Sequence, residues 1–164
     1  MPATYEPITT TTLVSATNTI TFTGISQAYT DLVLVFNGSE SGASNPELRV
    51  GSGSIDTGSN YSWTFMGGDG SSATSSRAAN ATSINPAWNP GANTDYLAIY
   101  HFQNYSNTTT YKTVLIRSND TTGRAVVEVA LWRSNSAINQ IRIYDDYNNM
   151  KIGTTLTLYG IKAA

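Results

Sequence analysis

The sequence lacks cysteine and has few charged residues, and both absences exclude whole classes of protein. Without cysteine the chain can form neither disulfide bonds nor thiolate metal sites. Only 12% of the 164 residues are charged, the net charge is −2, and no basic run exists, so no nucleic-acid partner is expected. No apolar stretch approaches the roughly 20 residues of a membrane helix, so no membrane partner is expected either. The opening residues, MPATYEPITTTT, have neither the charged nor the apolar region of a secretory signal, and we expect none.

The most strongly patterned part of the chain is Asp95–Trp132, where three apolar runs are separated by two polar, turn-forming gaps. The runs are Tyr96–Phe102, Tyr111–Arg117 and Ala125–Trp132. Each is about 7 or 8 residues long and rich in β-branched and aromatic residues, which favours strands over helices. This segment therefore predicts a three-stranded antiparallel meander at the centre of a sheet.

Shorter strand patterns precede and follow this meander, and no sustained helical periodicity, tandem repeat or internal domain boundary interrupts them. Roughly eight to ten short strands predict an all-β fold, an antiparallel β-sandwich of jelly-roll type in a single domain with long Gly/Ser-rich loops. Residues 1–12 are expected to form an extended N-terminal arm, because Pro2 and Pro7 exclude a central strand but allow an edge position. Residues 13–164 then form the sandwich. Such an arm buries too little apolar surface to order itself, so a neighbouring subunit or another partner outside the domain is expected to order it.

The core is predicted from the alternation within each strand run. In the third run of the meander, Val127, Val129 and Leu131 are expected to face inward, with Glu128 on the opposite face. A Val129→Asp substitution would then bury an unpaired charge and abolish folding. The predicted core includes one residue from each strong strand: Leu34, Ile99, Val114, Val129, Ile143 and Leu158.

Catalytic residues are not predicted. His101 is the only histidine and hence the only conventional base for a serine nucleophile, but no GxSxG motif accompanies it, so a structural role is favoured. The glycine-rich Gly67–Gly70 has no P-loop lysine and no following helix, so no phosphate-binding cofactor is expected. No separated pair of carboxylates can be named for glycoside hydrolysis.

A cluster of carboxylate and amide side chains lies in Asp145–Asn149. Its oxygen atoms are of the kind that calcium prefers, but the spacing and the closing glutamate of an EF-hand are absent. Asp and Asn are also the usual turn-forming residues, so a solvated turn is the favoured interpretation and cation binding is left open.

Tryptophan and tyrosine are abundant for a chain with 4 phenylalanines, with 3 and 10 residues respectively. Both combine a large apolar body with a polar tip, which suits subunit interfaces and sugar-stacking surfaces. Trp63 is expected in the core, and Trp132 over the second face of the sheet. Trp88, between Pro86 and Pro90, is the best candidate for an exposed contact, with simple anchoring of the loop as the alternative.

Four segments together resemble virion structural proteins of tailed bacteriophages, including those of cyanophages. They are GSNYSWTFMGGDGSSATSSR (Gly58–Arg77), HFQNYSNTTTYKTVLIRS (His101–Ser118), ALWRSNSAINQIRIY (Ala130–Tyr144) and LTLYGIKAA (Leu156–Ala164). The resemblance spans nearly the whole chain, and its motifs are specific only in combination. Such proteins include capsid decoration (cement) proteins and tail or fibre components, and the resemblance implies no catalytic residue.

The resemblance implies a protein of the phage particle surface, with two alternatives for its role. The first is a homotrimeric capsid decoration protein that binds the major capsid protein at capsid junctions and stabilises the head. The second is a tail or fibre component that binds host cell-surface glycan on Trp88 and tyrosines. The expected partner-binding residues are Pro2, Ala3, Tyr5 and Trp88. Because the charge is low, attachment is expected to survive raised salt.

Overall fold

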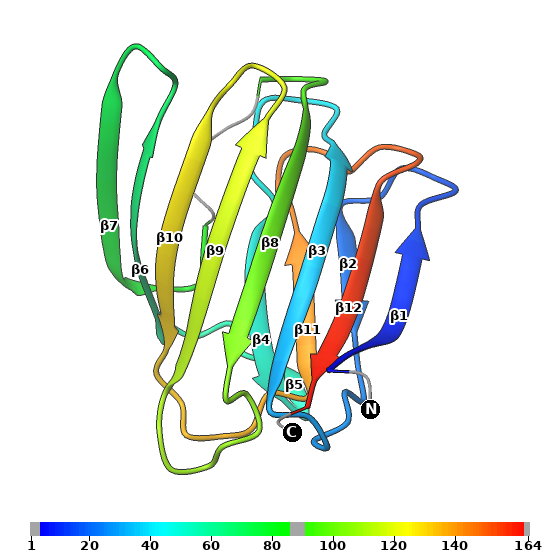
Figure 1. Ribbon diagram of the computed structural model, residues 1–164, viewed down its shortest axis with the longest axis vertical. Helices are drawn as coiled ribbons and strands as arrows, with labels where there is room; N and C mark the ends of the chain where they lie inside the picture. Colours follow the sequence, from blue (N-terminus) through cyan, green and yellow to red (C-terminus); the bar gives the residue numbers. More distant parts are fainter. Residues whose placement is uncertain (1–3, 86–90, 163–164) are drawn as a thin grey trace.

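The computed structural model describes residues 4–85 and 91–162, and within these residues it contains two antiparallel β-sheets and no helix (Figure 1). The larger sheet has eight strands, in the order β1 (Tyr5–Thr12), β12 (Thr155–Ile161), β3 (Asp31–Ser39), β8 (Asp95–Gln103), β9 (Lys112–Asp120), β10 (Ala125–Trp132), β6 (Tyr61–Gly68) and β7 (Ala73–Ala81). The smaller sheet has four, in the order β2 (Thr19–Phe22), β11 (Gln140–Tyr144), β4 (Glu47–Ser52) and β5 (Ser54–Ile55). The predicted all-β sandwich is confirmed.

The hydrophobic core lies between the two sheets. Figure 1 shows the smaller sheet behind β8, β3 and β12 of the larger one. The large sheet contributes Phe36 and Tyr100 among its fully buried side chains, and the small sheet contributes Leu48 and Ile141. The first described strand pairs with the last and β2 pairs with β11, so the two ends of the chain are nested as in a jelly roll.

The meander predicted for Asp95–Trp132 is present as β8, β9 and β10, which are neighbours in the larger sheet and pair antiparallel. Successive side chains of β8 alternate between the two faces of the sheet. Tyr100 and Phe102 point into the core, and Leu97 and Ile99 lie on the other face of the strand.

The inward face predicted for β10 was wrong. Glu128 is buried at 1% exposure, whereas Val127 and Val129 are 46% and 52% exposed. Val129 is therefore not a core residue, and the expectation that Val129→Asp abolishes folding fails with it. Ile99 is also only half-buried and lies on the same outer face. The other predicted core residues are fully buried: Leu34, Val114, Ile143 and Leu158.

The N-terminal segment is a strand of the larger sheet. β1 pairs with β12 along its length, with a bulge between Pro7 and Thr9, as expected where an edge strand contains proline. β12 of the same chain therefore orders Tyr5–Thr12, and for these residues the expectation that a partner must do so is corrected.

The hairpin of β6 and β7 forms the other end of the larger sheet. The Gly/Ser-rich stretches were predicted to be long loops, but in one of them Ala73–Ala81 pairs with β6 as a full strand. In Figure 1 this hairpin projects beyond the smaller sheet, so both of its faces are less covered than those of β3 or β8.

Candidate functional site

The most unusual surface of the molecule is the face of the larger sheet that points away from the smaller sheet. We call it the outer sheet face and define it by the outward side chains of β3, β8, β9, β10 and β6. Cross-strand register places them in two adjoining rows. The first row is Val35, Ile99, Arg117, Val127 and Met66, and the second is Val33, His101, Leu115, Val129 and Thr64.

Apolar side chains dominate both rows, and apart from the buried Val33 they remain at least partly accessible. Met66 is 67% exposed, in addition to the half-exposed Val127 and Val129. Single exposed apolar residues are ordinary on a protein surface, but a contiguous group spread over five strands marks an interaction surface. The residues that carry this candidate site are therefore the valines that sequence reasoning assigned to the core.

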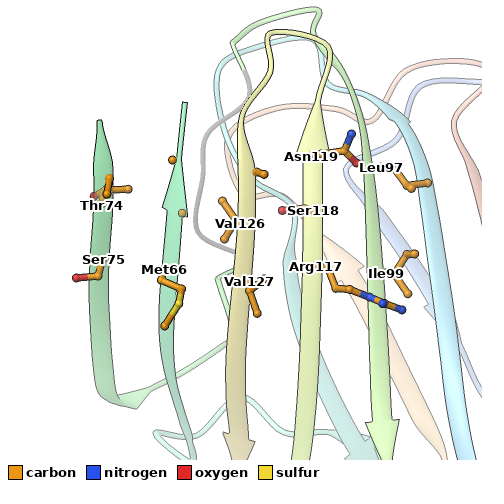
Figure 2. Close-up of a pocket in the computed structure, with 14 residues that line it drawn as sticks. Met66, Thr74, Ser75, Leu97, Ile99, Arg117, Ser118, Asn119, Val126 and Val127 are labelled. Atoms are coloured by element: carbon orange, nitrogen blue, oxygen red, sulfur yellow. The ribbon is translucent and has the colours of Figure 1, made fainter. Parts of the chain in front are cut away.

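A groove of about 920 Å³ lies at one end of the outer sheet face, over β8, β9, β10, β6 and β7. Figure 2 shows Met66 and Val127 on its floor and Arg117 extending from β9 beside Ile99. Small residues meet in register along one part of the groove, where Gly68 pairs with Ala125 on one side and with Ala73 on the other.

The lining of the groove determines what it can do chemically. Its described lining is mostly apolar, with neutral polar groups from Thr74, Ser75, Ser118 and Asn119. Arg117 is the one charged side chain among these described lining residues, which include no histidine or carboxylate. Such a surface offers no acid–base pair and suits the binding of an apolar partner that carries a negative group.

A smaller hollow of about 260 Å³ continues the outer sheet face below the groove. It is lined by Val129 and Leu131 of β10, by Thr113 of β9, and by Thr64 and Arg77 of the β6–β7 hairpin. The linings of the two hollows are alike, because each combines aliphatic side chains with one arginine. Together they form one continuous surface on the outer sheet face.

His101, the only candidate base, also lies on the outer sheet face. Its Nε2 atom is 3.0 Å from Oδ2 of Asp31, and Oδ1 of Asp31 accepts the backbone N–H of Asn104 at 2.7 Å. Asp31 is the only side chain that the described residues bring into hydrogen-bond contact with His101. The contact between His101 and Asp31 links the end of β8 to the start of β3.

The Asp145–Asn149 segment forms a turn, as predicted. The predicted exposure to solvent fails for Asp145, the first residue of the turn, which is buried. Oδ1 of Asp145 accepts the backbone N–H groups of Tyr147 and Asn148, at 2.7 and 3.1 Å. The Asp145 side chain itself is buried, whereas Asp146 and Tyr147 are exposed. No group of three or more His, Cys, Asp or Glu residues is close enough to hold a metal ion in the part of the chain that the structure describes.

The predicted partner-binding residues are only partly within the described structure. Tyr5 is 56% exposed on the edge strand β1, and its ring meets that of Tyr159 edge-on at 6.4 Å. Pro2, Ala3 and Trp88 lie outside the described residues. The structure does not bring Tyr5 to the groove, because β12 and β3 lie between β1 and β8, the nearest strand that lines the groove.

The other two tryptophans lie on the inner face of the larger sheet. Trp132 is buried, and its indole N–H donates to Oδ2 of Asp56 at 2.7 Å. Trp63 is partly buried against the core, and its ring lies 6.1 Å from that of Phe65 at an interplanar angle of 30°. Trp63 therefore packs against the core as predicted, whereas Trp132, predicted over the second face of the sheet, is part of the core itself.

Comparisons with known proteins identify no family for this chain. No protein-family model matches it, and no curated protein matches it. Among solved structures, an alginate lyase Aly36B mutant in complex with alginate tetrasaccharide aligns with 89% of this chain and 82% of its own, at 12% identity and a TM-score of 0.33. A second mutant of the same lyase, in complex with alginate trisaccharide, aligns at 10% identity and a TM-score of 0.29. A protein of unknown function from Shewanella oneidensis MR-1 aligns over 84% of this chain and 61% of its own, at 8% identity and a TM-score of 0.26. These likenesses are too low to bear on function.

No helix in the described residues is long and apolar enough to cross a membrane.

Proposed function

We propose that this protein is a structural component of a tailed-phage virion, a decoration protein that binds the major capsid protein at capsid junctions through its outer sheet face. The sequence resemblance described above motivates the assignment to a virion. The exposed apolar rows of the outer sheet face support attachment through this face, because a partner that covers accessible apolar surface removes it from water.

The size of the outer sheet face fits a protein interface. Neighbouring strands are roughly 4.8 Å apart and each residue extends a strand by roughly 3.4 Å. A surface five strands wide and about seven residues long therefore measures roughly 500 Å². A stable interface takes about 800 Å² from each partner. The five strands therefore supply more than half of a standard interface, and neighbouring loops would supply the rest.

The chemistry of this surface selects the complementary partner. The partner surface should be apolar at its centre and carry carboxylates opposite Arg117 and Arg77, which stand at the two hollows. Because apolar burial dominates such a contact, raised salt should leave it largely intact.

The test is attachment to capsids that lack this protein. Val129→Asp places a charge in the centre of the outer sheet face and should abolish binding. Thr10→Asp is the matched control, since Thr10 is exposed on β1 of the same sheet but far from the apolar rows. Undiminished attachment of the Val129→Asp variant, or release of the wild-type protein by moderate salt, would argue against this mode of binding.

We also propose that the protein forms a homotrimer. Exposed tyrosines at Tyr5, Tyr111 and Tyr147 provide side chains of the kind that subunit interfaces favour. Threefold closure lets one pair of complementary patches be buried on every subunit. Sedimentation at micromolar concentration should give three times the mass of the chain, and a monomer would contradict the proposal.

A tail or fibre component that binds glycan is the second candidate. The adjacent rings of Trp63 and Phe65 favour it, because both lie on the inner face of β6, where the hairpin extends past the smaller sheet, and both remain partly exposed. Aromatic rings so placed can stack on sugar rings. Binding on a glycan array that is lost in a Phe65→Ala variant would favour this candidate over capsid decoration.

A further inference from the structure

Two carboxyl groups meet in the interior without a cation beside them. Glu40 follows β3 and Asp145 follows β11, and each is 1% exposed. Neither forms an ion pair with a Lys, Arg or His side chain in the described residues. Burying two like charges together is strongly unfavourable, so a proton or a positive ion must accompany them.

Ser44 lies between the two carboxyl groups and cannot satisfy both of them. Its hydroxyl contacts Oδ2 of Asp145 and lies 3.1 Å from Oε2 of Glu40. It also accepts the side-chain N–H of Asn148 at 2.7 Å. A serine hydroxyl has a single proton to donate. Ser44 can therefore donate a hydrogen bond to only one of the two carboxyl groups.

One carboxyl oxygen of the pair, Oε1 of Glu40, is buried without any hydrogen-bond partner among the described residues. The phenol oxygen of Tyr96, which pairs in register with Gly38 two residues before Glu40, is also buried without a partner there. Burial, followed by the charges of Tyr100, Glu40 and Asp145, raises the pKa of Tyr96. Buried polar atoms without a hydrogen-bond partner are rare in native proteins.

The two loops that carry these groups are held together by their own hydrogen bonds. The backbone N–H of Ser41 donates to the carbonyl of Asn149 at 2.9 Å, and the N–H of Asn149 donates to Oγ of Ser41 at 3.2 Å. Gly42 allows this approach, because a Cβ atom there would lie 1.9 Å from the side-chain oxygen of Asn148. The oxygen atoms are thus gathered before any ion arrives.

We propose that Glu40, Ser44, Asp145 and Asn148 form a calcium site that joins the loop after β3 to the loop after β11. All of these side chains offer hard oxygen ligands, which calcium prefers, and its coordination shell can be completed by water or backbone carbonyls. The amide of Asn148 would rotate to present its oxygen to the ion. The site is independent of the proposed role in the virion.

Two acidic ligands predict a site of modest affinity. Calcium affinity is set by the number of charged ligands and by the rigidity of the site, and weak extracellular modules have dissociation constants of roughly 10⁻⁴–10⁻³ M.

The experiment is thermal unfolding of the full chain after treatment with a chelator, with calcium chloride then added at constant ionic strength. At 10 mM calcium we expect the melting temperature to rise by roughly 3–10 °C. Glu40→Gln and Asp145→Asn should remove this rise. Glu40→Gln should still fold, since glutamine resembles the protonated acid. Asp146→Asn is the matched control, because Asp146 is the exposed carboxylate next to Asp145, and this variant should keep the rise.

Isothermal titration with calcium chloride gives the second measurement, which does not depend on stability. Heat of binding for the wild type and for Asp146→Asn, but not for Asp145→Asn, would support the site. No calcium-dependent rise in the wild type, or an equal rise in Glu40→Gln, would overturn it. An equal effect of magnesium chloride would overturn the assignment to calcium, since magnesium requires a smaller octahedral site.

Discussion

Val129 and Ala130 are adjacent in β10 but lie on opposite faces of the larger sheet, so the same substitution at each should have very different consequences. Val129 is 52% exposed and Ala130 is 1% exposed. Full burial of a valine contributes roughly 1.5–3 kcal/mol, so its half-burial contributes about 1 kcal/mol. Replacing valine by aspartate in a strand costs up to about 1 kcal/mol more in β-propensity. We therefore expect Val129→Asp to lower the free energy of unfolding by roughly 1–2 kcal/mol and to leave the fold intact.

Ala130→Asp should instead prevent folding or come close to it. Its neighbours across the strands are Val114 and Trp63, and the packed core there leaves neither space nor a partner for a carboxylate. An unpaired buried charge of this kind costs upwards of about 4 kcal/mol, a large part of the roughly 5–15 kcal/mol that stabilises a typical domain.

Urea denaturation followed by far-UV circular dichroism and by tryptophan fluorescence measures both effects. With a slope of roughly 2 kcal/mol per molar urea, Val129→Asp should shift the midpoint down by about 0.5–1 M. Ala130→Asp should shift it by at least about 2 M or give an unfolded protein. Similar losses in both variants, or the reverse order, would mean that β10 is paired one residue out of register, because a one-residue slip exchanges the two faces of a strand.

Two further substitutions test the interior. In the absence of calcium, the folded protein retains a proton on Glu40 between pH 4.5 and 9 that the unfolded chain has lost, so the free energy of unfolding should fall by up to about 1.4 kcal/mol per pH unit as the pH rises through this window. Denaturation of Glu40→Gln across this range should lack that contribution, and an unchanged slope would show that Glu40 is not its source. Gly51→Ala should destabilise the protein by roughly 1–3 kcal/mol, because a Cβ atom there would lie 1.8 Å from the carbonyl oxygen of Ser54 in the β4–β5 hairpin. Ser52→Ala, an exposed position in the same hairpin, is its control and should change stability by less than about 0.5 kcal/mol.

The sequence predicted the position of the central strands well but not which face of β10 is buried. Strand positions could be predicted because β8, β9 and β10 are apolar runs bounded by turn-forming residues. The face could not, because the outward set of Val127, Val129 and Leu131 is more apolar than the inward set, which contains Glu128. Alternation arguments assume that the apolar face is the core face, and that assumption fails where a surface is itself apolar.

Two other differences have different physical reasons. β7 was missed because Ala73–Ala81, apart from Arg77, is composed of small polar residues and alanine, and its pairing with β6 rather than its propensity makes it a strand. The cluster of Glu40 with Asp145 could not be predicted because its members are far apart in sequence. They meet only because the strands that precede them, β3 and β11, belong to the two opposed sheets. Periodicity in the sequence indicates local structure and does not predict contacts between residues that are distant in sequence.

The nested pairing of the two ends of the chain determines the order in which the fold can form during synthesis. β1 pairs only with β12, and β2 only with β11, so the earliest strands to leave the ribosome must wait for the last ones. The hairpins β6–β7, β8–β9 and β9–β10 can form much earlier, since their partners are close in sequence. A nascent chain halted before Thr155 would therefore have a paired central sheet and an unpaired β1, and such open strand edges promote association between incomplete chains.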